Sequence, residues 1–432
     1  MRTPSWLAVV FSFLPSKRTN KIVTPRTQSR NASRNGRTTE STTPRTQSRN
    51  ASRNGRTTTS EPTTPRTVGE TPTSGGGDDR ATYLKAFDES KAGVKGLVDT
   101  GTATIPSIFV RPREERLKDY EISSKNISVP TIDMNARDER TKNIVAKELT
   151  DAAKEWGFFQ VVNHGIPLDV LENMLEGIRR FHEQDTEVKK PYYNRDYHAN
   201  TVIYNSNHDL FSSNAANWRD TMSVNTLFTN GHYDPEDIPP ACRDAALRYI
   251  KEITNLGDYI LSLLSIGLGL KPERLGELES TKGWSLSCHY YPKCPQPQLT
   301  LGLNGHADMS FFTILLQDQI SALQILHENQ WVNINPISGA LTFNIGDTLR
   351  IISNDILKSV YHRVIARDIG PRVSLPFFFN GTFASTQMYG PLKELTSEEN
   401  PPIYREFTLA EFMTYFLTVK VDELGVDHFR LK

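Results

Sequence analysis

The ten residues LNGHADMSFF (Leu303–Phe312) join two polar side chains to the start of an apolar segment. His306 and Asp308 stand two residues apart, directly before SFFTILLQ (Ser310–Gln317), which has the character of a buried β-strand. Polar groups at the edge of a core lose free energy of hydration unless they find partners. The stretch therefore indicates either a strand end at the surface or a site where His306 and Asp308 bind a ligand.

Short β-type segments surround this stretch and continue to the end of RVSLPFFFN at Asn380. Gly, Pro, Asn and Asp separate them about every ten residues, a spacing typical of an antiparallel sandwich or barrel. We expect about eight such strands to close into a jelly roll. The segments are LSCHYYP, SFFTILLQ, LQILHENQWVNI, GALTFNIGDTLRIIS, SVYHRVIA and RVSLPFFFN.

The preceding part of the folded chain has a different pattern, because helical periodicity dominates it. Val145, Leu149, Ala152 and Trp156 lie at spacings of three and four residues, which places them on one helical face that ends at Gly157. Further helices are predicted at 168–182, 244–268 and 408–420, and a strand at FFQVVNHG. The predicted class is mainly β, with an α/β N-terminal region and helices flanking a double-stranded β-helix (jelly-roll) core.

The first of four predicted segments, residues 1–80, is basic and rich in Arg, Ser and Thr. The stretch TPRTQSRNASRNGRTT occurs at Thr24–Thr39 and again at Thr43–Thr58, without apolar positions that stacked repeats could bury. We therefore expect a disordered extension. Three origins are open: an organelle transit peptide, a non-functional tandem expansion or mis-set start, and a nucleic-acid-binding arm, which lacks interleaved aromatic residues. The other segments are a helical α/β region (81–280), the jelly-roll core (281–385) and a C-terminal helical segment (386–432).

The composition of the 432 residues limits the possible partners and compartments. The 50 Lys and Arg balance 50 Asp and Glu, so net charge gives no reason to expect nucleic acid or a membrane as a partner. Cys242, Cys288 and Cys294 form an odd, sparse set, which suits a reducing compartment better than a disulfide framework. We expect a cytoplasmic monomer, or import into an organelle if the extension is a transit peptide.

His306 and Asp308 gain meaning from a third residue, His362. On a strand, residues 306 and 308 point to one face, so an imidazole and a carboxylate can reach the same ion. His362 stands within the β-type run SVYHRVIA and can supply another ligand from a neighbouring strand. Two histidines and one carboxylate are the facial triad of non-haem Fe(II) oxygenases. The pair alone is a weak signal, since this spacing occurs by chance in many proteins.

Arg372 and Ser374 strengthen the prediction, because alternation puts both on one strand face. A guanidinium inside a β-barrel is costly unless an anion satisfies it. A carboxylate bound bidentately by Arg372 and capped by Ser374 is the natural ligand. The alternative is a structural ion pair.

With these residues in place, the chain resembles a known family, the plant 2-oxoglutarate- and Fe(II)-dependent dioxygenases. The resemblance runs from about Phe87 to the C-terminus. It rests on NGHADMSFFTILLQDQISALQIL, ISNDILKSVYHRVIARDIGPRVSLPFF, WGFFQVVNHGIP and HYYPKCPQP. KAFDESKAGVKGLVDTG (Lys85–Gly101) further resembles the subgroup of 1-aminocyclopropane-1-carboxylate oxidase homologs, which includes desacetoxyvindoline 4-hydroxylase-like enzymes.

The resemblance implies a distorted jelly roll and assigns roles to particular residues. The family's iron ligands fall on the His306, Asp308 and His362 triad. Its clamp for the distal carboxylate of 2-oxoglutarate falls on Arg372, Ser374 and Tyr291. Two positions depart from the family pattern: His289 stands where asparagine is frequent, and Ala307 where threonine or serine is usual.

The activity implied is oxidation of a small specialised metabolite, with 2-oxoglutarate and O2 converted to succinate and CO2. We expect hydroxylation, although desaturation and demethylation use the same chemistry, and we expect ascorbate as reductant. Phe378, Tyr204 and Phe211 are candidates to line the substrate pocket, with plain core packing as the alternative for each. Two rival functions remain: an ethylene-forming 1-aminocyclopropane-1-carboxylate oxidase, which does not consume 2-oxoglutarate, and a catalytically silent jelly-roll binding protein.

Overall fold

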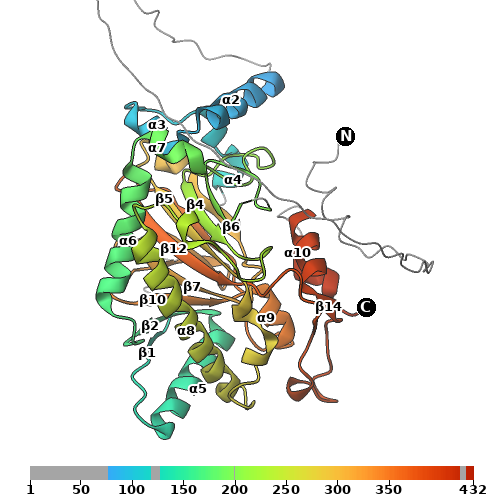
Figure 1. Cartoon of the computed structure of the whole chain (residues 1–432). Coiled ribbons are helices and arrows are strands. Elements are labelled where there is room, and N and C mark those ends of the chain that lie inside the picture. Colours follow the sequence, from blue (N-terminus) through green and yellow to red (C-terminus); the bar gives the residue numbers. More distant parts are fainter. Residues whose placement is uncertain (1–75, 118–126, 199, 419–424) are drawn as a thin grey trace, which may run out of the picture. The chain divides into compact units, whose positions relative to one another are not determined.

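Two β-sheets form the core of the computed structural model, which describes residues 76–117, 127–198, 200–418 and 425–432 (Figure 1). The predicted disordered extension falls outside these ranges up to residue 75 and stays a prediction. The larger sheet has the order β1 (Thr131–Asp133), β2 (Phe158–Val162), β10 (Leu341–Ile345), β7 (Phe312–Gln317), β12 (Arg372–Phe379), β5 (Trp284–Tyr291), β4 (Asp220–Asn225) and β3 (Val202–Asn205). The smaller sheet has the order β6 (Leu301–His306), β11 (His362–Ile365), β8 (Leu323–His327) and β9 (Gln330–Ile334).

The two sheets pack face to face through an apolar layer. Phe158, Tyr291 and Leu315 from the larger sheet belong to one buried cluster with Ile325 and Val364 from the smaller sheet. All pairings are antiparallel except that of β1 with β2. The predicted fold class, a jelly roll with flanking helices, is confirmed.

Helices α5 (Glu139–Glu155), α6 (Leu168–Glu183) and α8 (Arg243–Gly267) cover the outer face of the larger sheet (Figure 1). Asp138 begins α5 with a capping box, in which its carboxylate accepts the Thr141 N–H at 2.7 Å. Gly267 lets α8 approach α5, because a Cβ there would collide with the Thr150 side chain and the Ala146 carbonyl. The helices predicted in this part of the chain are confirmed. The other described helices are α2 (Gly76–Ser90), α3 (Gly93–Asp99), α4 (Arg113–Leu117), α7 (Thr186–Lys189), α9 (Asp347–Ile352) and α10 (Leu409–Thr418).

The segment resembling the homolog subgroup forms α2 and α3, which dock on the edge of the larger sheet. The carboxylate of Asp220 on β4 accepts the backbone N–H groups of Val94 and Lys95 at 2.7 and 2.8 Å. Gly93 permits this approach, since its φ is +70° and any Cβ would collide with the Asp220 carboxylate. Leu84, Phe87 and Phe109 bury a separate apolar cluster beneath the two helices.

Three details differ from the sequence-based expectation. Residues 347–352, expected within a β-type run, form α9, because a short buried apolar run has the same composition in a helix and a strand. The polar residues that follow His182 in the sequence predict polar surroundings for it, but it is fully buried and stacked on Tyr290 at 5.0 Å between ring centroids. The region 81–280 supplies β1 to β4, more strands than expected, and these join the same sheet as the 281–385 strands.

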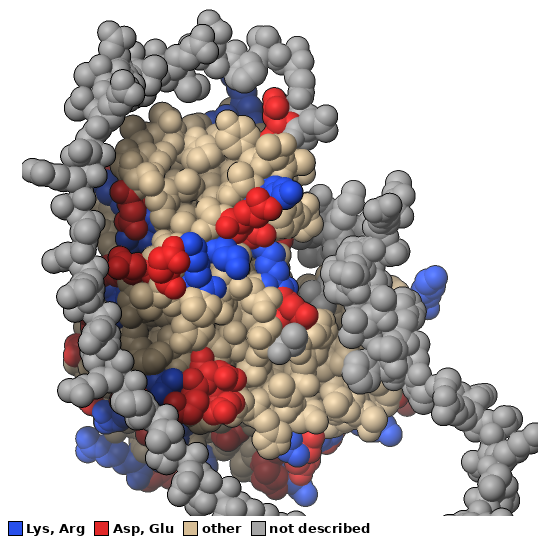
Figure 2. Space-filling model, turned by 45° about the horizontal axis from the view of Figure 1, so that its top comes forward, with Lys and Arg blue, Asp and Glu red and all other residues tan. Residues whose placement is uncertain are grey.

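Charged side chains of both signs are mixed on one face of the described residues (Figure 2), and the three cysteines lie in the interior. On the face in Figure 2, Lys and Arg groups stand beside Asp and Glu groups, so no extended single-sign patch forms there among the described residues. No described helix is long and apolar enough to cross a bilayer. Cys242, Cys288 and Cys294 are all buried free thiols.

Candidate active site

The two sheets bring His306, Asp308 and His362 together at one end of the smaller sheet. His306 ends β6, His362 begins β11, and the two residues are paired across the strands. One ligand atom from each of the three side chains lies within 4.8 Å of the others. The Asp308 Oδ1 atom is 3.5 Å from His306 Nε2 and 3.6 Å from His362 Nε2. Asp308 lies beyond the strand end, so the expectation that residues 306 and 308 share a strand face is wrong in this detail.

Each of the three side chains is oriented by a second contact. The Nδ1 atoms of His306 and His362 lie 2.9 and 3.1 Å from the carbonyl oxygens of Asn304 and Val360. A carbonyl can only accept, so Nδ1–H is the donor in both rings and each Nε2 keeps its lone pair for a ligand. These rings and the Asp308 carboxylate meet at a single point.

The second oxygen of Asp308 is already engaged. Asp308 Oδ2 accepts the Thr313 hydroxyl at 2.6 Å and the Asn344 amide at 2.9 Å, while Oδ1 faces the two imidazoles. Burial acts to raise the pKa of Asp308, but the His362 and His306 rings and the Thr313 hydroxyl hold it well below its ordinary value. Burial, with His306 nearby, lowers the pKa of His362 to about 4. One anionic oxygen and two neutral nitrogens on one side of a point suit Fe(II), so the donor set fits this ion.

Arg372 and Ser374 lie in the same pocket, on β12. The Arg372 side chain is 2% exposed and donates from Nη1 to Ser374 Oγ (3.1 Å) and from Nη2 to Gln317 Oε1 (2.8 Å). Its Nε donates to the Ile320 carbonyl at 3.1 Å. The Tyr291 ring lies 5.0 Å from the guanidinium carbon.

Two polar atoms beside this guanidinium have no hydrogen-bond partner among the described residues. They are the Tyr291 hydroxyl and Gln317 Nε2, and both are buried. Buried donors are rarely left unpaired, which indicates that a polar ligand completes this part of the pocket. Each atom can donate to a carboxylate held by Arg372, so the pocket fits 2-oxoglutarate as well as the metal.

Sequence reasoning missed three polar residues of this pocket: Thr313, Asn344 and Gln317. All three stand in strands that otherwise read as continuous apolar runs, and each has its side chain in the pocket or on a pocket residue. A polar residue inside such a run was the available signal. His289, noted as a departure from the family pattern, lines the same pocket and bonds the Thr221 hydroxyl through Nδ1 at 3.0 Å.

The three candidate substrate residues lie in different environments. Phe378 lines the pocket together with Ser374 and Pro376. Tyr204 is fully buried on the outer side of the sheet, where its ring packs on Phe181, so core packing describes it and the pocket prediction is wrong. Phe211 is 58% exposed and does not line the pocket.

A second hollow occurs between α6 and α8, lined by Val170, Asn173, Arg180 and Asp244. It lies in the outer helical layer and contains no metal-binding group of the kind found between the sheets. The chemistry therefore belongs to the pocket between the sheets.

Comparisons with known proteins agree with this geometry. Residues 285–381 match the 2OG-Fe(II) oxygenase superfamily, and residues 129–241 match the family described as non-haem dioxygenase in morphine synthesis N-terminal. The chain is 50% identical over 341 residues to 1-aminocyclopropane-1-carboxylate oxidase homolog 1 of Arabidopsis thaliana, covering 78% of this chain and 93% of that protein. It is 45% identical over 349 residues to deacetoxyvindoline 4-hydroxylase of Catharanthus roseus, covering 79% of this chain and 86% of that protein.

Among solved structures, the chain is similar to JOX2 in complex with 2OG, Fe and JA. The TM-score is 0.68 at 30% identity, over 79% of this chain and 98% of that chain. Together with the sequence identities, this shows that the chain belongs to the 2OG-Fe(II) oxygenase superfamily, in the plant subgroup of 1-aminocyclopropane-1-carboxylate oxidase homologs, and is an Fe(II)- and 2-oxoglutarate-dependent dioxygenase.

Proposed function

We propose that this dioxygenase hydroxylates a small specialised metabolite while 2-oxoglutarate is converted to succinate and CO2. The observation that carries the proposal is the pairing, in one pocket, of the His306–Asp308–His362 triad with the buried Arg372 guanidinium. The unpaired Tyr291 hydroxyl and Gln317 amide beside that guanidinium support a carboxylate ligand at the same place.

The residues of the chain bind, orient and exclude water. Arg372 and Ser374 would hold a carboxylate of 2-oxoglutarate, and His306, Asp308 and His362 would hold Fe(II) in the same pocket. When bound, Fe(II) supplies the activation of O2 and the oxidation chemistry, which the protein itself cannot perform. Apolar pocket walls keep bulk water from the reacting atoms. These walls are formed by Phe158, Leu303, Leu315, Leu323, Val364 and Phe378.

Known relatives support hydroxylation as the outcome. Deacetoxyvindoline 4-hydroxylase is named for this reaction type, and it covers most of the folded chain. JOX2 holds 2OG, Fe and JA in one complex. For the present chain we also propose ascorbate as reductant, a monomeric state and a cytoplasmic location.

The test is metabolite profiling with the purified protein, Fe(II), 2-oxoglutarate and ascorbate, under oxygen-18 gas. We expect one metabolite class to disappear, a product with one added oxygen-18 atom, and succinate in equal amount. A product that lacks the label but has lost two hydrogens would indicate desaturation instead. Ethylene release from 1-aminocyclopropane-1-carboxylate without succinate would favour the ethylene-forming alternative. Turnover of neither co-substrate by iron-loaded protein would contradict the proposal and favour a binding protein.

A further inference from the structure

A second arginine, Arg219, is buried near the pocket without a counter-ion. It directly precedes β4, and its residue is 3% exposed. No hydrogen bond or ion pair joins its guanidinium to any residue that the structure describes, and its Nε atom is both buried and unpartnered. Arginine cannot give up its charge in a protein, so an unpaired guanidinium is costly and indicates a ligand.

Two observations place Arg219 on the pocket side of the larger sheet. Thr221, two residues further on, pairs with the pocket residue His289 across β4 and β5 and bonds it at 3.0 Å, while the intervening Asp220 points to the opposite face, toward Val94 and Lys95. Burial lowers the pKa of His289, and the Arg219 charge adds to this lowering ahead of that of Arg372. The Arg219 charge therefore acts on the His289 ring.

Backbone contacts bring His208 near Arg219, because Ser206, two residues before His208, donates its hydroxyl to the Arg219 carbonyl at 2.9 Å. The Arg219 charge acts on the side chains of both His208 and Tyr197. His208 is exposed; desolvation lowers its pKa, the neighbouring Asp209 carboxylate raises it, and the charges of Arg219 and His306 lower it further. Its ring makes no hydrogen bond to a described residue. The Tyr197 hydroxyl accepts the Asn205 amide at 2.8 Å and keeps its own proton to donate. We call Tyr197, His208 and Arg219 the mouth subsite.

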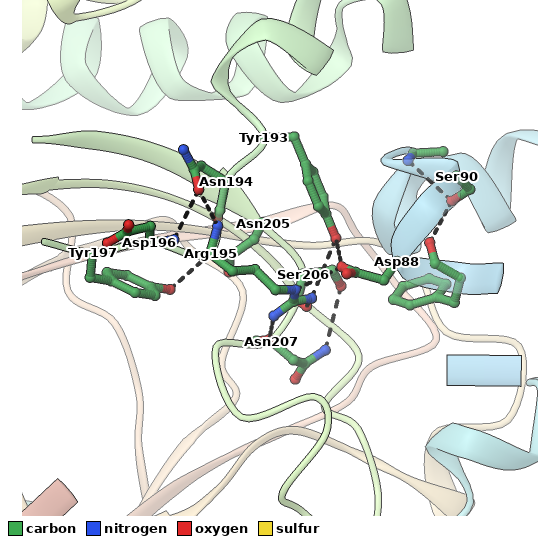
Figure 3. Close-up of polar contacts among 12 residues, drawn as sticks. Asp88, Ser90, Tyr193, Asn194, Arg195, Asp196, Tyr197, Asn205, Ser206 and Asn207 are labelled. Atoms are coloured by element: carbon green, nitrogen blue, oxygen red, sulfur yellow. Dashed lines mark hydrogen bonds and ion pairs between the residues drawn. The ribbon is translucent and has the colours of Figure 1, made fainter. Parts of the chain in front are cut away.

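A hydrogen-bonded frame around Arg195 holds the backbone of the mouth subsite, and Figure 3 shows this frame together with Tyr197. Arg195 donates to the carbonyls of Asn207 (2.7 Å) and Ser206 (3.1 Å), and its Nε donates to Asp88 on α2 at 2.7 Å. The Ser206 hydroxyl in turn donates to the Arg219 carbonyl at 2.9 Å. Helix α2 thus fixes the backbone that carries both His208 and Arg219.

The same frame reaches the iron-ligand strand. The Asn207 amide donates to the Asn217 carbonyl at 2.9 Å, and Asn217 Oδ1 accepts the Asn304 N–H at 2.8 Å. The Asn304 carbonyl holds His306 Nδ1 at 2.9 Å. The position of the mouth subsite relative to the triad is therefore set by direct hydrogen bonds.

We propose that Tyr197, His208 and Arg219 bind a carboxylate of the organic substrate, so that the substrate class is organic acids. The inference rests on the proposed function, because it assigns a substrate to the same site. A carboxylate matches the planar guanidinium fork, the fixed charge of Arg219 suits a single negative charge, and the Tyr197 hydroxyl can donate a further hydrogen bond.

The experiment measures equilibrium binding to protein loaded with Mn(II) and 2-oxoglutarate, which prevents turnover. The probes are phenylacetate, cinnamate and octanoate, each paired with its methyl ester. We expect at least one acid to bind about 10-fold to 100-fold more tightly than its ester. Arg219→Gln should remove this acid preference, and Arg219→Lys should retain part of it. Arg248→Gln, which breaks an exposed ion pair with Asp169, is the matched control and should retain all of it.

The outcomes separate the subsite from the proposed function. Acids that bind no better than their esters, or equal losses for acid and ester in Arg219→Gln, would overturn the subsite. If Arg219→Gln does not fold, His208→Ala decides, because that side chain is accessible: it should lower the acid preference about 3-fold to 10-fold, and an unchanged preference would overturn the subsite. Failure of the proposed function would appear separately, as wild-type protein that binds no 2-oxoglutarate.

Discussion

Arg372 and Arg219 stand in two regions of the larger sheet and are buried to almost the same degree, 2% and 3% exposed. Arg372 on β12 makes three hydrogen bonds to Ser374, Gln317 and Ile320, so its guanidinium is held in place before a ligand arrives. Arg219 beside β4 makes none to a described residue. A fixed guanidinium suits a co-substrate of constant shape, whereas an unconstrained one can follow an acid whose remaining structure varies.

The largest effect is expected at the triad, on which both regions depend. His306→Ala or Asp308→Ala should lower 2-oxoglutarate turnover by more than about 100-fold, because loss of a metal ligand costs more than loss of the groups that orient it. Turnover is measured as succinate release with saturating Fe(II). His327→Ala is a control, since His327 ends β8 outside the pocket and stacks on Trp156. Full activity in either ligand variant would show that the metal lies elsewhere.

The next effect separates the two arginines. Arg372→Gln should raise the KM for 2-oxoglutarate by about 30-fold to 100-fold, since a charge-assisted, two-pronged contact is lost. Ser374→Ala should raise it by a smaller factor, about 5-fold. Arg219→Gln should act chiefly on the KM of the organic acid. Steady-state kinetics, with the 2-oxoglutarate and the organic acid concentrations varied in turn, measures both KM values. Equal changes of both KM values in Arg372→Gln and Arg219→Gln would contradict separate roles for the two arginines.

His182 is also a buried basic side chain, but unlike an arginine it can lose its proton. Burial, with Lys189 nearby, lowers the pKa of His182 from 6.5 to about 3, so the folded protein holds it neutral. The unfolded chain takes up the proton first as pH falls, so its contribution to stability is complete above pH 6.5 and declines toward pH 3. From pH 7 to 5 we expect a loss of about 2 kcal/mol from this group.

Denaturant unfolding of metal-free protein at a series of pH values measures this loss. His182→Gln should be less stable at pH 7, because the contact of His182 with the Cys288 carbonyl is lost, yet it should show a shallower decline toward pH 5. Parallel curves for the variant and the wild type would mean that His182 is protonated in the folded state.

The smallest effect is expected at the frame of the mouth subsite. Asp88→Asn weakens the contact with Arg195, which holds Ser206 and through it the Arg219 carbonyl, and should raise the KM of the organic substrate about 3-fold to 5-fold. The KM for 2-oxoglutarate should not change, since Arg372 has separate supports. Glu89→Gln, on the exposed side of α2, is the matched control. An equal rise in both KM values would indicate general loosening of the sheet.

The contrast also explains what the sequence could predict. Arg372 and Ser374 lie within the three residues RVS, and the triad lies within two short motifs, so local spacing was enough to propose both sets. Strand alternation was wrong for Asp308, which lies beyond the end of β6, and Tyr291 came only from the family resemblance. Tyr197, His208 and Arg219 come from separate loop segments, and the contacts that connect these segments run through Asn205, Ser206 and Arg195. The hydrophobic periodicity of the sequence does not predict such long-range contacts. The prediction of a β-strand at 347–352 was wrong for a related reason. Only the tertiary structure decides whether a short apolar run forms a helix, as α9 does, or a strand.

The most direct test of the account measures succinate release from 2-oxoglutarate by the wild-type protein, Arg372→Gln and His306→Ala, with and without Fe(II). The account predicts Fe(II)-dependent release by the wild type. Raising the 2-oxoglutarate concentration should restore release in Arg372→Gln but not in His306→Ala. Release that persists without Fe(II), or an Arg372→Gln variant with unchanged KM, would contradict the assignment of this pocket as the site of the triad and the clamp.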